Sequence, residues 1–318
     1  MPGILSPVIY VTIGLPRALL YYRYGALWKT FFEQLGCKIL LSCKTDQRIL
    51  DRGDALSDSE CCLPVKAYVG HLEALASRCD VLFVPRFERL GKHEEFCVRF
   101  WGLTDIARAT FPGVRVLSYN VCRPGSELWG FLEVGAALGK SPAASLGAYR
   151  LGKIAQREWE RRALHRQRQL LEAQGPKVLV AAQPYIVHDP AIGGPLVRLL
   201  RQQGAVPIFA ESCPRSAARR SARALTHSLY WTMNKEVVGA IELLRPHIDG
   251  VILVSAFPCG TDCLVNEVVL RRVKGLPITQ IILDGQHGNA GLQTRIECFL
   301  DVIAAHHRAL GGGQGHAG

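Results

Sequence analysis

The fold of this chain is decided by the stretch Val8-Ile9-Tyr10-Val11-Thr12-Ile13-Gly14, an apolar and largely β-branched run that ends at glycine. Such a run is typical of a strand buried on both faces of a parallel sheet. A helical pattern follows over about residues 17–35, and Gly36 ends it before a second apolar run at Lys38–Leu41. Strand, helix and strand in this order predict a parallel α/β unit.

The same alternation continues along the chain. Further strands are predicted at residues 81–84, 114–117, 178–181, 207–209, 251–254 and 278–283, and further helices at 64–76, 195–203, 224–244, 262–274 and 291–305. A long, charged helical pattern covers residues 143–173. We therefore expect two Rossmann-like (flavodoxin-like) lobes with mostly parallel sheets: an N-terminal α/β lobe at 1–145, a helical connector at 146–175, a C-terminal α/β lobe at 176–308 and a flexible tail at 309–318.

The composition is that of a globular protein. Of 318 residues, 48% are hydrophobic and 20% are charged, which suffices for two domains with real cores. Eleven cysteines, an odd number without regular spacing, argue against a secreted disulfide framework. The first residues lack signal-peptide features, and no apolar stretch is long enough to span a bilayer. We therefore expect a cytoplasmic protein whose thiols stay reduced.

The net charge of +11 is concentrated in two arginine-rich runs, at residues 157–168 and 215–223. A solvated helix face is the first interpretation. Docking of an acidic protein, or of the phosphates of a nucleotide-like substrate such as coenzyme A, is the second. No nucleic-acid-binding motif accompanies the arginines, so nucleic acid is not an expected partner.

The sequence also lacks a GxxxxGK[ST] phosphate loop and a dinucleotide-binding glycine fingerprint, so ATP hydrolysis or NAD binding by a standard route is not expected.

Three cysteines follow predicted strands. They are Cys62, just before the predicted helix at 64–76, Cys97, after a polar loop, and Cys259, in a tight turn before Gly260. Ligands of open α/β sheets collect outside the carboxyl ends of the strands, so cysteines that are distant in sequence can converge there. Convergent thiolates are the usual ligands of iron–sulfur clusters. Ser57, Asp58 or Ser59 is the expected cap of the helix that follows Cys62.

Other interpretations of the cysteines stay open. A free cysteine is often only a small buried hydrophobic residue, which suits Cys37, Cys79 and Cys298. This interpretation suits Cys43, Cys122, Cys213 and Cys263 less well. A fourth ligand is expected from one of these, Cys122, Cys213 and Cys263 above all, or from outside the chain, unless the fourth iron has no protein ligand. Cys61 is the alternative cluster ligand to its neighbour Cys62. A structural zinc site is a further alternative, in which Cys259, Cys263 and His287 would take part, although the chain has no CxxC pair.

Five blocks, in order along the chain, resemble the proteins related to activases and electron-transferring components of 2-hydroxyacyl-CoA dehydratases. They are Ile13-Gly14-Leu15-Pro16-Arg17-Ala18-Leu19; Glu60-x-Cys62-x-Pro64-x-Lys66 with Gly70-His71; Gln183-Pro184-Tyr185 with Asp189-Pro190; Phe257-Pro258-Cys259-Gly260-Thr261-Asp262 with Asn266-Glu267; and Ala290-Gly291-x-x-Thr294-Arg295-x-Glu297-x-Phe299-x-Asp301. The resemblance extends from Ile13 to about Ile303.

The resemblance implies a 4Fe–4S cluster, or a double-cubane cluster as in some relatives, with its ligands on Cys62, Cys97 and Cys259. It also implies a separate ATP-hydrolysing activator or reductase as electron donor, an acyl-CoA or other small-molecule substrate, and a homodimer or hetero-oligomer. Two positions depart from the family pattern: Gly285 and Asn289 stand where acidic residues are usual, and Ala182-Gln183 replaces a Gly-His pair. The departures favour, as an alternative, a non-catalytic cluster carrier or regulatory subunit.

Overall fold

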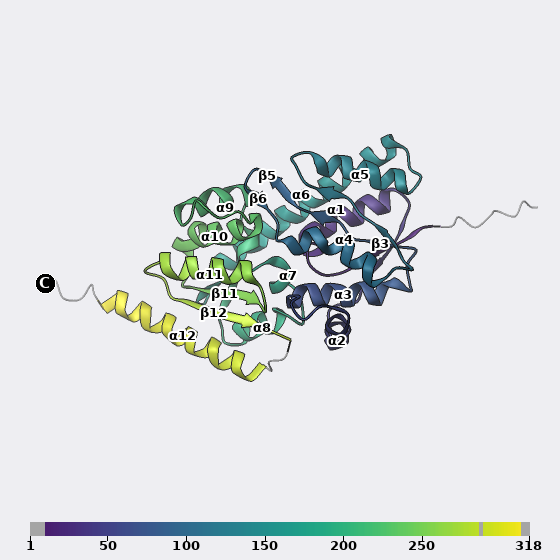
Figure 1. Cartoon of the computed structure of the whole chain (residues 1–318). Coiled ribbons are helices and arrows are strands. Elements are labelled where there is room, and N and C mark those ends of the chain that lie inside the picture. Colours follow the sequence, from purple (N-terminus) through teal and green to yellow (C-terminus); the bar gives the residue numbers. More distant parts are fainter. Residues whose placement is uncertain (1–9, 286–288, 313–318) are drawn as a thin grey trace, which may run out of the picture.

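The N-terminal lobe is built on a parallel sheet. The computed structural model of the chain describes the backbone of residues 10–285 and 289–312, which form two α/β lobes (Figure 1). The first sheet has the order β2-β1-β3-β7 with every neighbouring pair parallel. Its strands are β2 (Lys38–Leu41), β1 (Thr12–Leu15), β3 (Val81–Phe83) and β7 (Arg115–Leu117). The strand predicted at 8–13 thus begins at Thr12, and residues 8 and 9 lie outside the described part of the chain.

The C-terminal lobe repeats this plan. Its sheet has the order β10-β9-β11-β12, again parallel throughout. The strands are β10 (Val206–Phe209), β9 (Lys177–Ala181), β11 (Gly250–Ala256) and β12 (Ile278–Leu283). In each lobe the second strand is at the edge, beside the first, and the third and fourth follow, as in flavodoxin-like sheets. The predicted fold class, two Rossmann-like lobes with parallel sheets, is confirmed.

The central strands are buried on both faces, which is why they are continuously apolar in sequence. In β9, Val178 and Val180 belong to the core cluster that contains Leu196 of α8 (Gly194–Gln202) and Phe299 of α12 (Asn289–Gly312). The alternate residues of β9 belong to a second cluster, on the opposite face, together with side chains of α10 (Thr232–Leu244) and α11 (Gly260–Arg272). Because side chains alternate along a strand, a sheet covered by helices on both sides needs apolar residues at every position.

The helices cover these sheets, and two short strand pairs extend the first lobe. The N-terminal lobe has α1 (Tyr21–Gln34), α2 (Gln47–Leu56), α3 (Leu63–Ala76), α4 (Val98–Thr110) and α5 (Ser126–Ala137), with β4 (Arg86–Phe87) beside β8 (Asn120–Val121) and β5 (Arg89–Gly91) beside β6 (Glu94–Glu95). The C-terminal lobe has α7 (Pro184–Val187), α8 (Gly194–Gln202), α9 (Arg215–Ser221), α10 (Thr232–Leu244), α11 (Gly260–Arg272) and α12 (Asn289–Gly312), with short 3-10 turns at Ala210–Ser212, Ala222–Ala224 and Arg245–His247.

The long helix α6 (Pro142–Glu172) joins the lobes. It begins at Ser141, whose hydroxyl accepts a hydrogen bond from the Ala144 N–H, and it packs along α1. Toward the first lobe, the Gln156 amide donates to the Arg23 carbonyl at 2.8 Å. Toward the second lobe, the Gln167 side chain both donates to the carbonyl and accepts from the N–H of Phe209. The helix therefore holds backbone groups of both lobes.

The helix predicted at 224–244 is wrong in its first part. Helical structure stops near Leu225, and α10 begins only at Thr232. The segment between them pairs with the N-terminal lobe, because the Glu95 N–H donates to the Tyr230 carbonyl at 3.0 Å. At the other end of the chain, α12 continues through Gly312, and residues 313–318 of the predicted tail lie outside the described residues.

Candidate functional site: three cysteines at helix N-termini

Cys62 is the N-cap residue of α3, in extended conformation with φ −68° and ψ 151°. The predicted caps Ser57, Asp58 and Ser59 are wrong, because the chain turns into the helix only after Cys62. The Cys62 carbonyl accepts the Val65 and Lys66 N–H groups, while the Leu63 N–H donates to the Phe257 carbonyl of the other lobe at 3.0 Å. That bond ties the first turn of α3 to the loop that carries Cys259.

Cys97 is the N-cap residue of α4 and follows the β5–β6 hairpin. Its carbonyl accepts the Phe100 N–H at 2.9 Å. From the first turn of the same helix, the Arg99 guanidinium donates to the Glu60 carbonyl at 2.9 Å. Arg99 therefore connects the start of α4 to the loop just before Cys62, and its charge offsets part of the effect of burial, which raises the pKa of both thiols.

Cys259 is the N-cap residue of α11 and follows β11 through a cis Phe257–Pro258 peptide. Its sulfur lies 3.4 Å from the Thr261 hydroxyl. Next along the helix, Asp262 is buried and accepts hydrogen bonds from the Asn234 amide at 2.7 Å and the Gln183 amide at 3.2 Å. Side chains from α10 and from the loop after β9 thus position the first turn of α11.

The three sulfurs share one electrostatic environment. Burial raises the pKa of the Cys62 thiol to about 11, and the neighbouring Cys97 also raises it. Burial likewise raises the pKa of Cys97 and of Cys259, and Cys62 adds to the shift of Cys259. Burial raises the pKa of Tyr185 as well, and the charges of Asp262 and all three cysteines raise it further. The structure therefore brings the three cysteines together around Tyr185 and Asp262.

Each of the three cysteines stands at the N-terminus of a helix of 13 or 14 residues, and its side chain accepts no capping hydrogen bond there. The free N–H groups at a helix N-terminus carry partial positive charge and stabilise anions. Burial raises the pKa of all three thiols, and the backbone amides of Val65, Arg99 and Asp262 lower it in part at Cys62, Cys97 and Cys259, respectively. The helix N-termini therefore offset part of the effect of burial on the thiolates.

Buried polar atoms beside the cysteines lack partners. The Asp262 Oδ2, the Gln183 Oε1 and the Asn266 Nδ2 atoms are buried and have no hydrogen-bond partner in the described part of the chain. Unpaired buried polar groups are costly, so such a cluster is unusual away from functional sites. Gln183 stands where the resembling family has histidine. Its contact with Asp262 makes that departure part of the site.

The remaining cysteines differ in burial and in what they pack against. Cys61 is 5% exposed and packs into the N-terminal core, which leaves Cys62 as the member of the pair that faces the site. Of the candidate fourth ligands, Cys213 is buried in the core of the second lobe, Cys122 is half-buried, and Cys263 is exposed on α11. Cys37 and Cys79 pack against the first core as expected, whereas Cys298 and Cys43 are exposed.

The described residues contain no group of three His, Cys, Asp or Glu side chains placed around a single metal ion. A tetrahedral zinc ion with Zn–S bonds of 2.3 Å needs sulfurs only about 3.8 Å apart. The ligand sulfurs of an iron–sulfur cluster are more widely spaced, because each binds a different iron. His287, named for a mixed zinc site, lies outside the described residues.

Sequence reasoning placed the cysteines but missed part of their surroundings. Tyr185, Gln183 and Asp262 stand in the quoted blocks, although their contacts with the thiols carry no signal in sequence. Asn234 was not singled out, because its role depends on the packing of α10 against α11.

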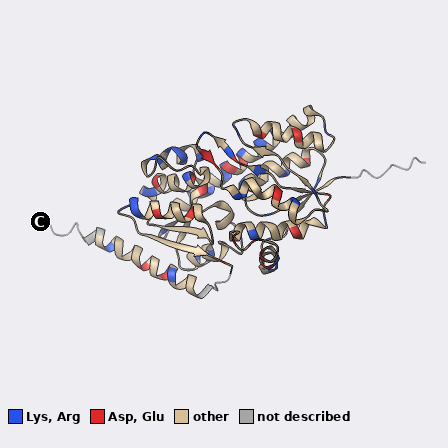
Figure 2. Ribbon diagram, in the orientation of Figure 1, with Lys and Arg blue, Asp and Glu red and all other residues tan. Residues whose placement is uncertain are grey.

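The arginine-rich run at 215–223 is partly paired: Arg219 contacts Glu94 and Glu236, and Arg215 contacts Glu160. Figure 2 shows the basic residues gathered on α9.

Comparison with known proteins gives one match. The family model described as "CoA enzyme activase uncharacterised domain" matches residues 12–213, which is more than half of the chain and includes Cys62 and Cys97. Cys259 lies beyond the matched range. A search of curated proteins found no match. Among the described helices, none combines the length and apolar content that a membrane span requires.

Proposed function

Because the chain belongs to the CoA enzyme activase uncharacterised domain family, we propose that it is an iron–sulfur electron-transfer component of a CoA-linked enzyme system. In this proposal Cys62, Cys97 and Cys259 hold a 4Fe–4S cluster, or part of a double-cubane cluster. The observation that carries the proposal is the placement of three free thiols at the N-termini of three helices, in mutual electrostatic contact.

The donor set suits such a cluster. Thiolates are the ligands that iron–sulfur clusters require, and the three sulfurs are free of disulfides. When bound, a cluster of this kind supplies a one-electron redox centre. The partial positive charge of the helix N-termini at Cys62, Cys97 and Cys259 would face the ligand sulfurs, and positive charge near a cluster raises its reduction potential. Deprotonation of thiols whose pKa is raised by burial would accompany assembly, so cluster binding releases protons.

The proposal includes a direction of electron flow. We propose that a separate ATP-hydrolysing activator or reductase donates one low-potential electron to the chain, which itself has no GxxxxGK[ST] phosphate loop. The chain passes that electron to an acceptor of the CoA-linked system, such as an acyl-CoA thioester. A homodimer or a hetero-oligomer with the partner remains the predicted assembly.

A second function, a non-catalytic cluster carrier, is favoured by one observation. Gln183, rather than an imidazole, contacts the Asp262 carboxylate beside Cys259, and an amide neither takes up nor releases a proton. A carrier needs only electron transfer, whereas dehydration of a hydroxyacyl group also needs proton transfer. The carrier would deliver its electron to the enzyme that performs the chemistry.

Electron paramagnetic resonance of the anaerobically reconstituted chain tests the proposal. We expect a cluster signal to appear when a cognate ATP-dependent reductase and ATP are both present, and to be lost in Cys62→Ser, Cys97→Ser and Cys259→Ser. Cys43→Ser, an exposed cysteine apart from the site, is the matched control and should behave as wild type. Reduction of an acyl-CoA by the chain alone would identify the enzyme, and reduction only through a third protein the carrier. A reconstituted chain that accepts no electron from any such reductase refutes both.

A further inference from the structure

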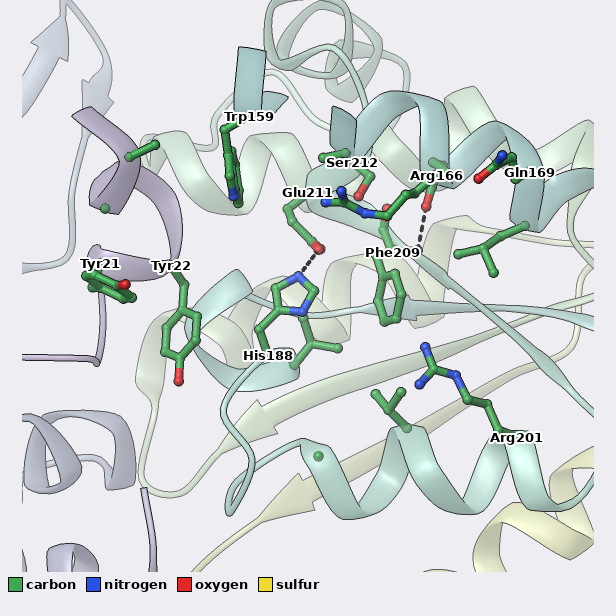
Figure 3. A pocket seen from close by; sticks show the side chains of 18 of the residues that line it. Tyr21, Tyr22, Trp159, Arg166, Gln169, His188, Arg201, Phe209, Glu211 and Ser212 are labelled. Atoms are coloured by element: carbon green, nitrogen blue, oxygen red, sulfur yellow. Dashed lines mark hydrogen bonds and ion pairs between the residues drawn. The ribbon is translucent and has the colours of Figure 1, made fainter. Parts of the chain in front are cut away.

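A cavity of about 910 Å³ lies between the lobes, and none of the three site cysteines lines it. Figure 3 shows that its walls come from both lobes and the connector: Tyr21 and Tyr22 of α1, Trp159 and Arg166 of α6, His188 after α7, Arg201 of α8, and the segment from Phe209 to Ser212. This volume is at the upper end of the range of small-molecule sites, about 300–1,000 Å³. It exceeds what a single inorganic ion would fill.

The cavity is strongly basic. Four cations line it: Lys29, Arg166, Arg198 and Arg201. None of the four forms an ion pair with a carboxylate of the described residues, whereas the buried Arg23 and the half-buried Arg219 nearby are both paired. Unpaired guanidinium groups that line a shared concave surface favour phosphate, which accepts two parallel N–H bonds from each.

The one carboxylate of the lining is already engaged. Glu211 Oε1 lies 2.5 Å from His188 Nε2. Burial opposes the charged imidazole, but the charge and the hydrogen bond of Glu211 together raise the pKa of His188 above its usual value. The pair therefore carries little net charge when the imidazole is protonated. The four free cations are not offset within the cavity.

Aromatic side chains supply a second kind of surface. Tyr21, Tyr22, Trp159 and Phe209 all line the cavity. In Figure 3 the Trp159 ring extends from α6 into the cavity, and the Tyr22 ring approaches from α1. A heteroaromatic base stacks on such rings, with about 1–3 kcal/mol for each stacked base. A polyphosphate without a ring would leave this part of the cavity unused.

We propose that this cavity binds a nucleoside diphosphate group, with its phosphates on Arg166, Arg198, Arg201 and Lys29 and its base among Trp159 and the tyrosines. Free nucleotides and coenzyme A both carry this group. The proposal does not depend on the cluster, since no cysteine of the thiol site lines the cavity.

Calorimetric titration of the full-length chain tests this assignment with four probes: ADP, coenzyme A, adenosine and pyrophosphate. We expect ADP and coenzyme A to bind, and adenosine and pyrophosphate to bind more weakly by at least about tenfold, since each lacks one half of the recognised group. Equal binding of ADP and coenzyme A identifies a nucleotide site. Tighter binding of coenzyme A identifies the coenzyme as the source of the group.

Charge reversal provides the matched comparison. Arg201→Glu and Arg166→Glu should each weaken ADP binding at least about tenfold, whereas Arg168→Glu, on the exposed face of α6 outside the cavity, should leave it unchanged. Trp159→Leu should weaken ADP but not pyrophosphate. The triple serine variant of Cys62, Cys97 and Cys259 should still bind ADP, which separates this proposal from the cluster. Failure of both ADP and coenzyme A to bind at about 1 mM, or an equal loss in Arg168→Glu, overturns it.

Discussion

Arg23 of α1 and Glu236 of α10 form a bidentate ion pair buried between the two lobes, with Nη1–Oε2 2.6 Å and Nη2–Oε1 3.0 Å. Arg219 adds a third hydrogen bond to the same carboxylate at 2.7 Å. The buried Arg23–Glu236 ion pair therefore connects the two lobes, and helix α6 connects them as well. Near the cysteines the lobes also meet directly, where the Leu63 N–H of α3 donates to the Phe257 carbonyl in the loop that carries Cys259.

Removal of Glu236 should strongly destabilise the fold. Glu236→Ala leaves Arg23 buried without its partner, and we expect a loss of about 3–5 kcal/mol in the free energy of unfolding, measured with urea at neutral pH. Burial alone would raise the pKa of Glu236, but Arg23 and the other arginines lower it overall. A lowered folded-state pKa contributes stability above the unfolded value of about 4.3, and that contribution is lost as the pH falls below it.

The control for this prediction is Glu158→Ala, which removes an exposed glutamate of α6 that forms no ion pair within the described part of the chain and should change stability by less than about 0.5 kcal/mol. The difference between wild type and Glu236→Ala should also shrink below about pH 4. A Glu236→Ala protein as stable as Glu158→Ala would show that the lobes do not depend on this pair.

Close packing of α2 on α3 should be intolerant of a methyl group at Gly53. A Cβ at this position would lie 1.9 Å from the Lys66 carbonyl oxygen, which belongs to the backbone of α3 and cannot move aside alone. We expect Gly53→Ala to cost about 1–3 kcal/mol in thermal or urea unfolding. In Gly102→Ala, on α4, the added methyl group meets open space, so this variant should gain about 0.5–1 kcal/mol from helix propensity. Equal effects of the two substitutions would contradict the observed α2–α3 contact.

His188 should titrate above its usual range because of Glu211. Its pKa is raised, since the Glu211 charge and hydrogen bond outweigh burial. A raised folded-state pKa contributes stability below about pH 6.5 that is lost as the pH rises through the folded value. Glu211→Gln should therefore lower the pKa measured by NMR of the imidazole C–H signals, whereas Glu172→Gln, an exposed change of the same charge, should not. An unchanged titration in Glu211→Gln would show that the pair is absent in solution.

The sequence predicted the sheets better than the site. The apolar runs at residues 38–41 and 278–283 predicted β2 and β12 with their observed bounds, although both are edge strands and only partly buried. The prediction of a helix at 224–244 was wrong in its first part, because the hydrogen bond between Tyr230 and Glu95, 135 residues away, overrides the local helix propensity of that segment. Of the three cysteines expected after strands, Cys97 follows β6 and Cys259 follows β11, whereas Cys62 follows α2, a helix that the sequence analysis did not predict. The contact of Asn234 with Asp262 depends on helix packing, which leaves no local pattern.

The central claim is that Cys62, Cys97 and Cys259 together bind a cluster, and iron with acid-labile sulfide per chain tests it most directly. Anaerobically purified wild type should contain about four irons and four sulfides per chain, or about eight of each if the cluster is a double cubane. Each of Cys62→Ser, Cys97→Ser and Cys259→Ser should lose most of both, while the exposed Cys43→Ser and Cys298→Ser should retain them. Wild-type protein without iron or sulfide after anaerobic reconstitution, or serine variants that retain both, would contradict the account.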